Sequence, residues 1–300
     1  MSNLQWFLVI FGWFSVLVFA VGVAYKAIKF STMPQNLRWE VYPVPHEERE
    51  KRHYGGSYME EIDWAKKPLH TSLAGEIAEM GSEIFFLKRV REYNPFGLWP
   101  FSMAMHWGMY LLFTWIFLLL VEVILKVSAI SPITNIAGIV AFISGAFGCL
   151  TLILKRATNS ELSLYTAPVD YFNLLFMLSI FGTGILSWIT DSSLINSRKY
   201  VEGIIFFNLS DVPPIVILNF LLFELFLIYM PFTKLLHYVA KYFNFHQSLW
   251  DDAFKDKGSP KDKRNLEQVG YKFFWAGPHS LPNKTWLENA QDLVLEEKKK

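Results

Sequence analysis

The sequence is almost without cysteine and has little net charge. The first feature excludes an iron–sulfur cluster held by this chain, and the second argues against binding of nucleic acid. Cys149 is the only cysteine among 300 residues, so the chain forms no internal disulfide and cannot by itself hold an iron–sulfur cluster. Iron–sulfur chemistry must therefore belong to a partner, and we interpret Cys149 as a small packing residue. The net charge of +1 argues against nucleic acid as a partner.

Histidine is missing from a long central part of the chain. None of the seven histidines lies from Trp107 to Leu236, whereas His106 and His237, which flank this gap, belong to apolar segments. An imidazole in hydrocarbon is costly unless another group binds its nitrogen atoms. We therefore interpret His106 and His237 as the first candidates for functional residues.

Charge is sparse in five stretches of a chain that is 52% hydrophobic and has a mean hydropathy of +0.25. Each stretch supplies the roughly 20 helical residues that cross a hydrocarbon core of about 30 Å. The stretches are Trp6–Tyr25, Met105–Leu125, Ile133–Leu154, Val169–Ile189 and Val212–Phe232. The first lacks a charged start and a cleavage site, so we expect a retained helix. We predict an all-α membrane protein, a bundle of five transmembrane helices.

The distribution of Lys and Arg predicts the orientation of this bundle in the cytoplasmic (inner) membrane. Most of these cations flank one side of the spans, whereas the other side has little beyond Lys126, Arg198 and Lys199. We therefore expect the N-terminus outside and the C-terminus in the cytoplasm. The predicted parts are a transmembrane helix (1–29), a cytoplasmic insert (30–100), a four-helix haem-binding core (101–244) and a cytoplasmic tail (245–300).

The insert contains an apolar stripe with helical spacing between Leu73 and Tyr93, which predicts an amphipathic helix. The stripe can lie on the membrane or against a protein, and spacing alone does not choose between them. We expect the insert and the tail to form a platform for a partner subunit.

The predicted topology places His106 and His237 at one depth near the cytoplasmic face. Two imidazoles so placed on two helices can bind the iron of one haem b from opposite sides. The alternative is that both are interfacial histidines with hydrogen bonds to neighbours. The other histidines are expected to be surface or partner contacts: His46, His53, His70, His246 and His279.

Several motifs carry a resemblance to known membrane cytochromes. They are MAMHWGMYLLF around His106, PFTKLLHYVAKYF around His237, LRWEVYPVPHE and YGGSYMEEIDWAKKP in the insert, and FFWAGPH in the tail. The chain resembles the gamma subunit of respiratory nitrate reductases. It is more similar to the cytochrome b subunits of heterodisulfide-reductase-like complexes that are associated with sulfate reduction.

The resemblance implies an electron-transfer subunit of a quinone-linked oxidoreductase complex. Its haem b would lie between the quinone pool (menaquinone, or methanophenazine in a methanogen) and a cytoplasmic iron–sulfur subunit of the heterodisulfide-reductase-like type. His106 and His237 match the ligands of the inner haem. Ile116 and Asn219 stand where an outer haem would have ligands, which implies a single haem.

Without an outer haem, we expect side chains to fill that half of the bundle. The expected residues are Phe142, Phe147, Phe181, Trp188, Phe220 and Phe223. With a single inner haem, we expect the quinone pocket in the cytoplasmic half, around the second and fifth spans.

Three further ionisable residues are candidates for the site. Lys234 lies one helical turn before His237 and is a possible partner of a haem propionate, with Arg89, Arg91, Lys155 and Arg156 as alternatives. Glu122 and Glu224 lie within spans and are possible proton relays, or are held neutral by hydrogen bonds between helices. The competing functions are a haem-free membrane anchor of a respiratory complex and a small transporter that uses Glu224.

Overall fold

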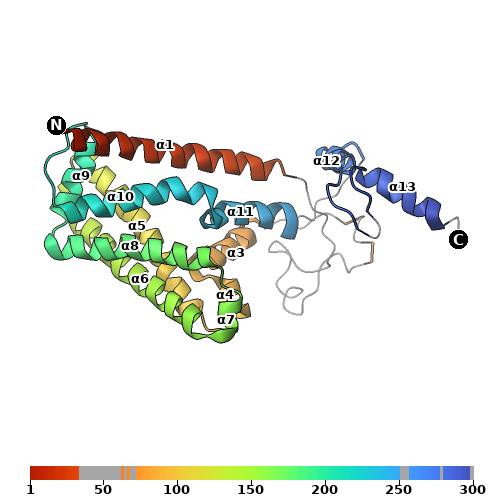
Figure 1. The fold of residues 1–300 in the computed structure, drawn as a ribbon, viewed down its shortest axis with the longest axis horizontal. Helices are drawn as coiled ribbons and strands as arrows, with labels where there is room; N and C mark the ends of the chain where they lie inside the picture. Colours follow the sequence, from red (N-terminus) through yellow and green to blue (C-terminus); the bar gives the residue numbers. More distant parts are fainter. Residues whose placement is uncertain (34–61, 64–65, 68–71, 251–256, 278–279, 298–300) are drawn as a thin grey trace. The chain divides into compact units, whose positions relative to one another are not determined.

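The computed structural model describes residues 1–33, 62–63, 66–67, 72–250, 257–277 and 280–297. The chain forms two compact units, Met1–Ala24 with Glu76–Leu236, and Tyr25–Gly75 with His237–Lys300. Figure 1 shows the helices of both. Residues 34–61, 64–65 and 68–71 of the predicted insert lie outside the described residues, as do His46, His53, His70 and His279.

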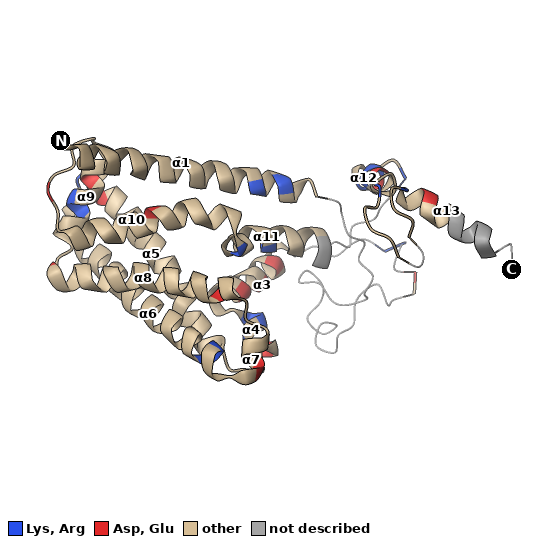
Figure 2. Ribbon diagram, in the orientation of Figure 1, with Lys and Arg blue, Asp and Glu red and all other residues tan. Residues whose placement is uncertain are grey.

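Within the described residues, five helices are long and apolar enough to cross a membrane, which confirms the predicted all-α membrane bundle. They are α1 (Asn3–Ser31), α5 (Trp99–Leu125), α6 (Ser131–Thr158), α8 (Pro168–Thr190) and α10 (Pro214–Tyr229). The helices α5, α6, α8 and α10 each have a proline in the first turn. Amide hydrogens in the first turn have no partner within the helix, so the missing hydrogen of proline costs nothing there. Most charged residues of these five helices lie near the helix ends, although α10 has an acidic residue within it (Figure 2).

Small residues let the central helices α5, α6 and α8 approach closely. A Cβ atom on Gly108 of α5 would lie 2.4 Å from the Cα atom of Gly145 in α6. A Cβ atom on Gly184 of α8 would lie 2.4 Å from the ring of Phe142, which is buried. Lipid supplies little hydrophobic drive for helices to associate, so this close van der Waals packing stabilises the bundle.

The sequence analysis missed α9 (Ile195–Ile205), a helix between α8 and α10. Its Arg198 reaches the end of α5, where Nε lies 2.5 Å and Nη2 3.3 Å from the carboxylate oxygens of Glu122. The same guanidinium donates to Oδ1 of Asn135 at 2.8 Å, and the Ser131 hydroxyl donates to Glu122 at 2.9 Å. This network ties α5, α6 and α9 together at one end of the bundle.

The predicted amphipathic helix is two helices, α3 (Leu73–Phe86) and α4 (Lys88–Tyr93), because the backbone changes direction at Leu87. Leu87 adopts φ 47°, a left-handed conformation, and its side chain is buried. The prediction of one continuous helix is therefore wrong. Most of the apolar stripe on α3, including Leu73, Ile77 and Ile84, is exposed within the chain.

Side chains of α5 hold the end of α3. Tyr110 Oη, Trp107 Nε1 and Trp99 Nε1 donate to three successive carbonyl oxygens at the C-terminus of α3, at 3.0, 3.1 and 2.7 Å. The last carbonyls of a helix have no partners within it. These three hydrogen bonds satisfy them and fix α3 beside the first half of α5.

The fifth span reaches Phe232 as predicted, but its α-helix α10 ends at Tyr229. Pro231 has no amide hydrogen to continue the helix, and two 3₁₀ turns follow α10, at Met230–Phe232 and Lys234–Leu236. His237 then begins α11 (His237–Asn244). His237 is therefore not on a continuation of the fifth span, and Lys234 does not share a helical face with it, so both predictions are wrong.

The second unit contains α11, the π-helical turn Phe245–Leu249, α12 (Pro260–Val269) and α13 (Trp286–Glu297). The hydroxyl of Ser259 accepts a hydrogen bond from the Asp262 amide at 3.1 Å, which caps α12. Phe273 is buried and packs edge-on against Trp286, with ring centroids 4.2 Å apart. Phe273 and Trp286 thus form an aromatic cluster within the described part of the tail. Two further short helices lie in the first unit, the 3₁₀ turn Ser128–Ile130 and α7 (Ser160–Leu164).

Replacement of Arg198 by Ala tests the network at the Glu122 end. The side chains of Arg198 and Glu122 are 18% and 4% exposed, so the variant leaves a buried carboxylate without its cation. We expect the free energy of unfolding in detergent to fall by about 3 kcal/mol. Lys199→Ala, which removes a neighbouring exposed cation, should change it by less than about 0.5 kcal/mol. Equal effects of the two changes would contradict this role of Arg198.

Candidate functional site

His106 lies in the first third of α5 and is half-buried. Its Nδ1 is 2.7 Å from the carbonyl oxygen of Ser102, one turn back. A carbonyl oxygen can only accept, so a neutral imidazole here carries its proton on Nδ1 and its lone pair on Nε2. Metal-binding histidines commonly have this arrangement, in which a backbone oxygen fixes the ring and the tautomer.

His237 is the first residue of α11, and its side chain is exposed. It belongs to the second unit, whereas His106 belongs to the first.

Two cations, Lys234 and Arg156, contact residues at or just before the start of α8. Lys234 forms an ion pair with Asp170, which also accepts a hydrogen bond from the Ala167 amide at 2.9 Å. Burial and the charge of Arg156 lower the pKa of Lys234, and the pairing with Asp170 opposes that shift. Arg156 donates to the hydroxyl of Thr166 at 3.1 Å. Its Nε is buried and has no hydrogen-bond partner among the described residues.

These residues fit a haem b in donor chemistry. Neutral imidazole is a normal axial ligand of haem iron, and His106 is held in the tautomer that binds through Nε2. The pair of Lys234 and Arg156 carries more positive charge than Asp170 neutralises, and the buried Nε of Arg156 lacks an acceptor. A propionate carboxylate would supply one. Lys234, the predicted propionate partner, pairs with Asp170, and Arg156, one of the predicted alternatives, has the unpartnered Nε.

The two positions that would hold outer-haem ligands have other surroundings. Nδ2 of Asn219, which is buried in α10, donates to the carbonyl oxygen of Ile180 at 2.7 Å and to the hydroxyl of Thr183 at 2.9 Å. Asn219 therefore joins α10 to α8. Ile116 instead lines a cavity.

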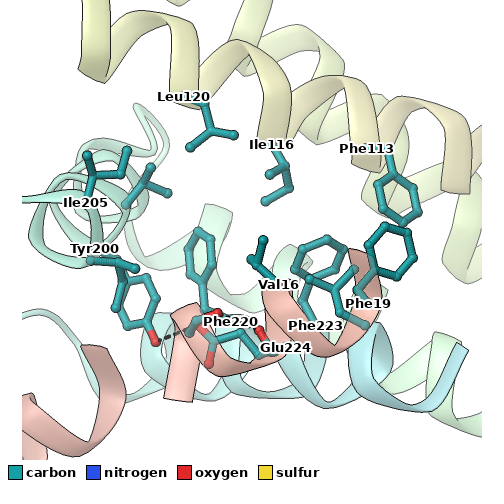
Figure 3. Close-up of a pocket in the computed structure, with 15 residues that line it drawn as sticks. Val16, Phe19, Phe113, Ile116, Leu120, Tyr200, Ile205, Phe220, Phe223 and Glu224 are labelled. Carbon is teal, nitrogen blue, oxygen red and sulfur yellow. Dashed lines mark hydrogen bonds between the residues drawn. The ribbon is translucent and has the colours of Figure 1, made fainter. Parts of the chain in front are cut away.

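The predicted filling of this half of the bundle is wrong in part. Phe142, Phe181, Phe220 and Phe223 are buried as predicted, and Trp188 is half-buried. Phe147, however, is 55% exposed on the outer face of α6. A cavity of about 230 Å³ remains between α1, α5, α9 and α10 (Figure 3).

Glu224 lines this cavity from α10 and is 6% exposed. Oε1 accepts a hydrogen bond from the Tyr200 hydroxyl at 3.2 Å, but Oε2 is buried without a partner among the described residues. Burial, and then the carboxyl of Glu224, raise the pKa of Tyr200 above its ordinary value. Tyr200 therefore keeps its proton and acts as the donor. Figure 3 shows the pair at the edge of the apolar lining.

The two carboxylates that were predicted as possible proton relays differ in their surroundings. Glu122 is satisfied by Arg198 and Ser131 and serves the network described above. Glu224 has an oxygen without a partner beside a cavity. The sequence analysis missed Tyr200, which gives Glu224 its polar contact, because it lies on α9, which was not predicted.

Comparison of the chain with protein-family models, with curated proteins and with solved structures gives no match. The resemblance to the cytochrome b subunits therefore stays a prediction that depends on the sequence motifs.

The variant Asn219→Leu tests whether Asn219 is a structural residue. The change removes two hydrogen bonds between α10 and α8, and such bonds contribute about 0.6–2 kcal/mol within membranes. We expect a loss of that size in the free energy of unfolding, and the spectrum of the predicted haem should not change. Loss of the haem signal without loss of stability would show that Asn219 belongs to a cofactor site.

Proposed function

We propose that this multi-pass membrane protein is a cytochrome b subunit of a quinone-linked oxidoreductase complex. It transfers electrons between the quinone pool, with menaquinone as the quinone, and a cytoplasmic iron–sulfur subunit of the heterodisulfide-reductase-like type. The observation that carries the proposal is the hydrogen bond of His106 to Ser102, which fixes an imidazole on a membrane-spanning helix in the way that a backbone oxygen commonly fixes a metal-binding histidine. The histidine-free stretch from Trp107 to Leu236 supports a single haem.

In this proposal, His106 and His237 are the axial ligands of one haem b, which supplies one-electron transfer that no protein side chain provides. The Ser102 carbonyl holds the His106 ring, and the hydrogen bonds from α5 to the end of α3 stabilise the same half of α5. Arg156 and Lys234 bind a propionate. The chain thus supplies ligands, charge compensation and an apolar surrounding.

The proposed orientation in the cytoplasmic membrane has the N-terminus outside and the C-terminus in the cytoplasm. Lys155 and Arg156 lie in the last turn of α6, and Lys88, Arg89 and Arg91 lie in α4, just before the start of α5. This excess of cations supports a cytoplasmic location for the His106 end of the bundle.

Replacement of either proposed ligand by Ala should abolish the reduced alpha band of a b-type haem. The protein should still insert into the membrane, because His106→Ala makes α5 more apolar and His237 lies outside the spans. His246→Ala is a matched control, since Nδ1 of His246 lies 2.8 Å from the Tyr242 carbonyl oxygen in the same one-turn geometry. A pyridine haemochrome assay should give one haem per chain. A protein without haem would support a simple membrane anchor, and two haems per chain would contradict the single-haem claim.

The tail supplies the proposed docking surface for the iron–sulfur subunit. Phe274 and Trp275 are 91% and 57% exposed, beside the buried Phe273. Exposed aromatic side chains of this kind are frequent anchors of protein interfaces.

The double variant Phe274→Ser with Trp275→Ser tests this surface. We expect it to release the partner subunit from membranes, as removal of residues 268–300 should, while the haem spectrum stays unchanged. Leu266→Ser, which alters an equally exposed apolar residue on α12, should retain the partner. Co-purification of the two subunits provides the measurement, and normal retention by the double variant would refute the proposed surface.

A further inference from the structure

We infer that the cavity between α1, α5, α9 and α10 binds a lipid-soluble ligand with a planar ring and a hydroxyl group, and that Glu224 accepts the hydrogen bond of that hydroxyl. The inference rests on the proposed function, in which this ligand is the quinol. It places the quinol in the half of the bundle that contains Ile116, not in the cytoplasmic half that the sequence analysis favoured.

The lining of the cavity selects an apolar ring. Ile116 and Leu120 of α5 lie opposite Phe220 and Phe223 of α10, and Val16 of α1 lies between the two helices (Figure 3). The volume of about 230 Å³ is somewhat smaller than the ~300 Å³ of the smallest typical ligand pockets. It therefore suits a ring head group, with an attached isoprenoid chain left in the surrounding lipid.

Aromatic side chains shape one wall for a flat ligand. The ring of Tyr200 stacks on that of Phe220 with centroids 4.4 Å apart and an interplanar angle of 18°. Phe113 and Phe223 meet edge to face at 5.7 Å. Rings in such offset and edge-on arrangements accept a further aromatic ring favourably.

One polar group in this lining lacks a partner. Oε1 of Glu224 is occupied by the Tyr200 hydroxyl, whereas Oε2 is buried without a hydrogen bond among the described residues. An unsatisfied buried acceptor is costly, above all within a membrane. A ring hydroxyl in the cavity supplies the missing donor. Tyr200 holds the carboxyl group and is thus a positioning residue.

Neighbouring helices leave little freedom for Glu224. A Cβ atom on Gly12 of α1 would lie 3.1 Å from its Oε1, so α1 covers the carboxyl closely. Ile116 lies ten residues beyond His106 on α5, which corresponds to about 15 Å along the helix axis. The site is therefore on the same helix as the proposed haem ligand but separate from it.

The test measures binding of menadiol, a naphthoquinol without an isoprenoid chain, to the full-length protein in nanodiscs under anaerobic reducing conditions. Isothermal titration would give the dissociation constant of the wild type and of three variants. Glu224→Leu removes the acceptor, and Ile116→Phe fills the cavity without touching a polar group. Glu202→Gln is the matched control, because Glu202 is an exposed carboxylate of α9 that does not line this cavity.

We expect Glu224→Leu and Ile116→Phe each to weaken menadiol binding at least tenfold, and Glu202→Gln to leave it unchanged. Because Ile116→Phe adds only apolar volume, it tests the site even if Glu224→Leu fails to fold. Unchanged binding in Ile116→Phe would overturn the inference.

A dithionite spectrum of the same samples separates this inference from the proposed function. An alpha band together with unchanged menadiol binding in both cavity variants would refute the site but not the cytochrome. Binding that depends on Glu224 and Ile116 in a protein without haem would support the site and refute the cytochrome.

Discussion

A polar group within a bilayer has no water to bond, and this constraint explains the arrangement of nearly every polar residue in the described bundle. Arg198 donates hydrogen bonds to Glu122, to Asn135 and to the carbonyl oxygen of Ser193. Asn219 joins α10 to α8, and the indole and phenol groups of α5 satisfy the end of α3. Where the constraint is met in full, the residues serve the fold. Where it is not, as at Oε2 of Glu224 and Nε of Arg156, a ligand is the natural partner.

Trp115 Nε1 and Asn173 Nδ2 are also buried without a partner among the described residues, but of these four side chains only Arg156 and Glu224 are ionisable, and they call for different ligands. Arg156 is a cation in the last turn of α6, near a lysine that already has its carboxylate, so the group it lacks is an anion. Glu224 is a carboxyl beside an apolar cavity, so the group it lacks is a donor on an apolar molecule. A haem propionate and a quinol hydroxyl meet these two needs. Both belong to one electron-transfer pathway in the proposed function.

The five spans were predicted from the sequence because length and apolar composition alone define a membrane helix. Features that depend on one backbone conformation or on tertiary contacts were not. The left-handed residue Leu87 divides an apparently continuous amphipathic stripe, and Pro231 ends the fifth span before His237. The helix α9 was missed because its many polar residues give no long apolar run in the sequence, although one face of the helix, which contains Tyr200, is buried. Among the site residues, His106 and Glu224 were found from their type and place in a span. The cavity and the contact of Glu224 with Tyr200 require three-dimensional packing, and so does the outward position of Phe147.

The central claim is that His106 and His237 together bind one haem b. Electron paramagnetic resonance of the oxidised, purified protein tests it most directly, because two imidazole ligands hold ferric haem in the low-spin state. The account predicts a single low-spin signal that accounts for one haem per chain and disappears when either histidine is replaced. A high-spin signal in the wild-type protein, two distinct low-spin signals, or no haem signal at all would contradict it.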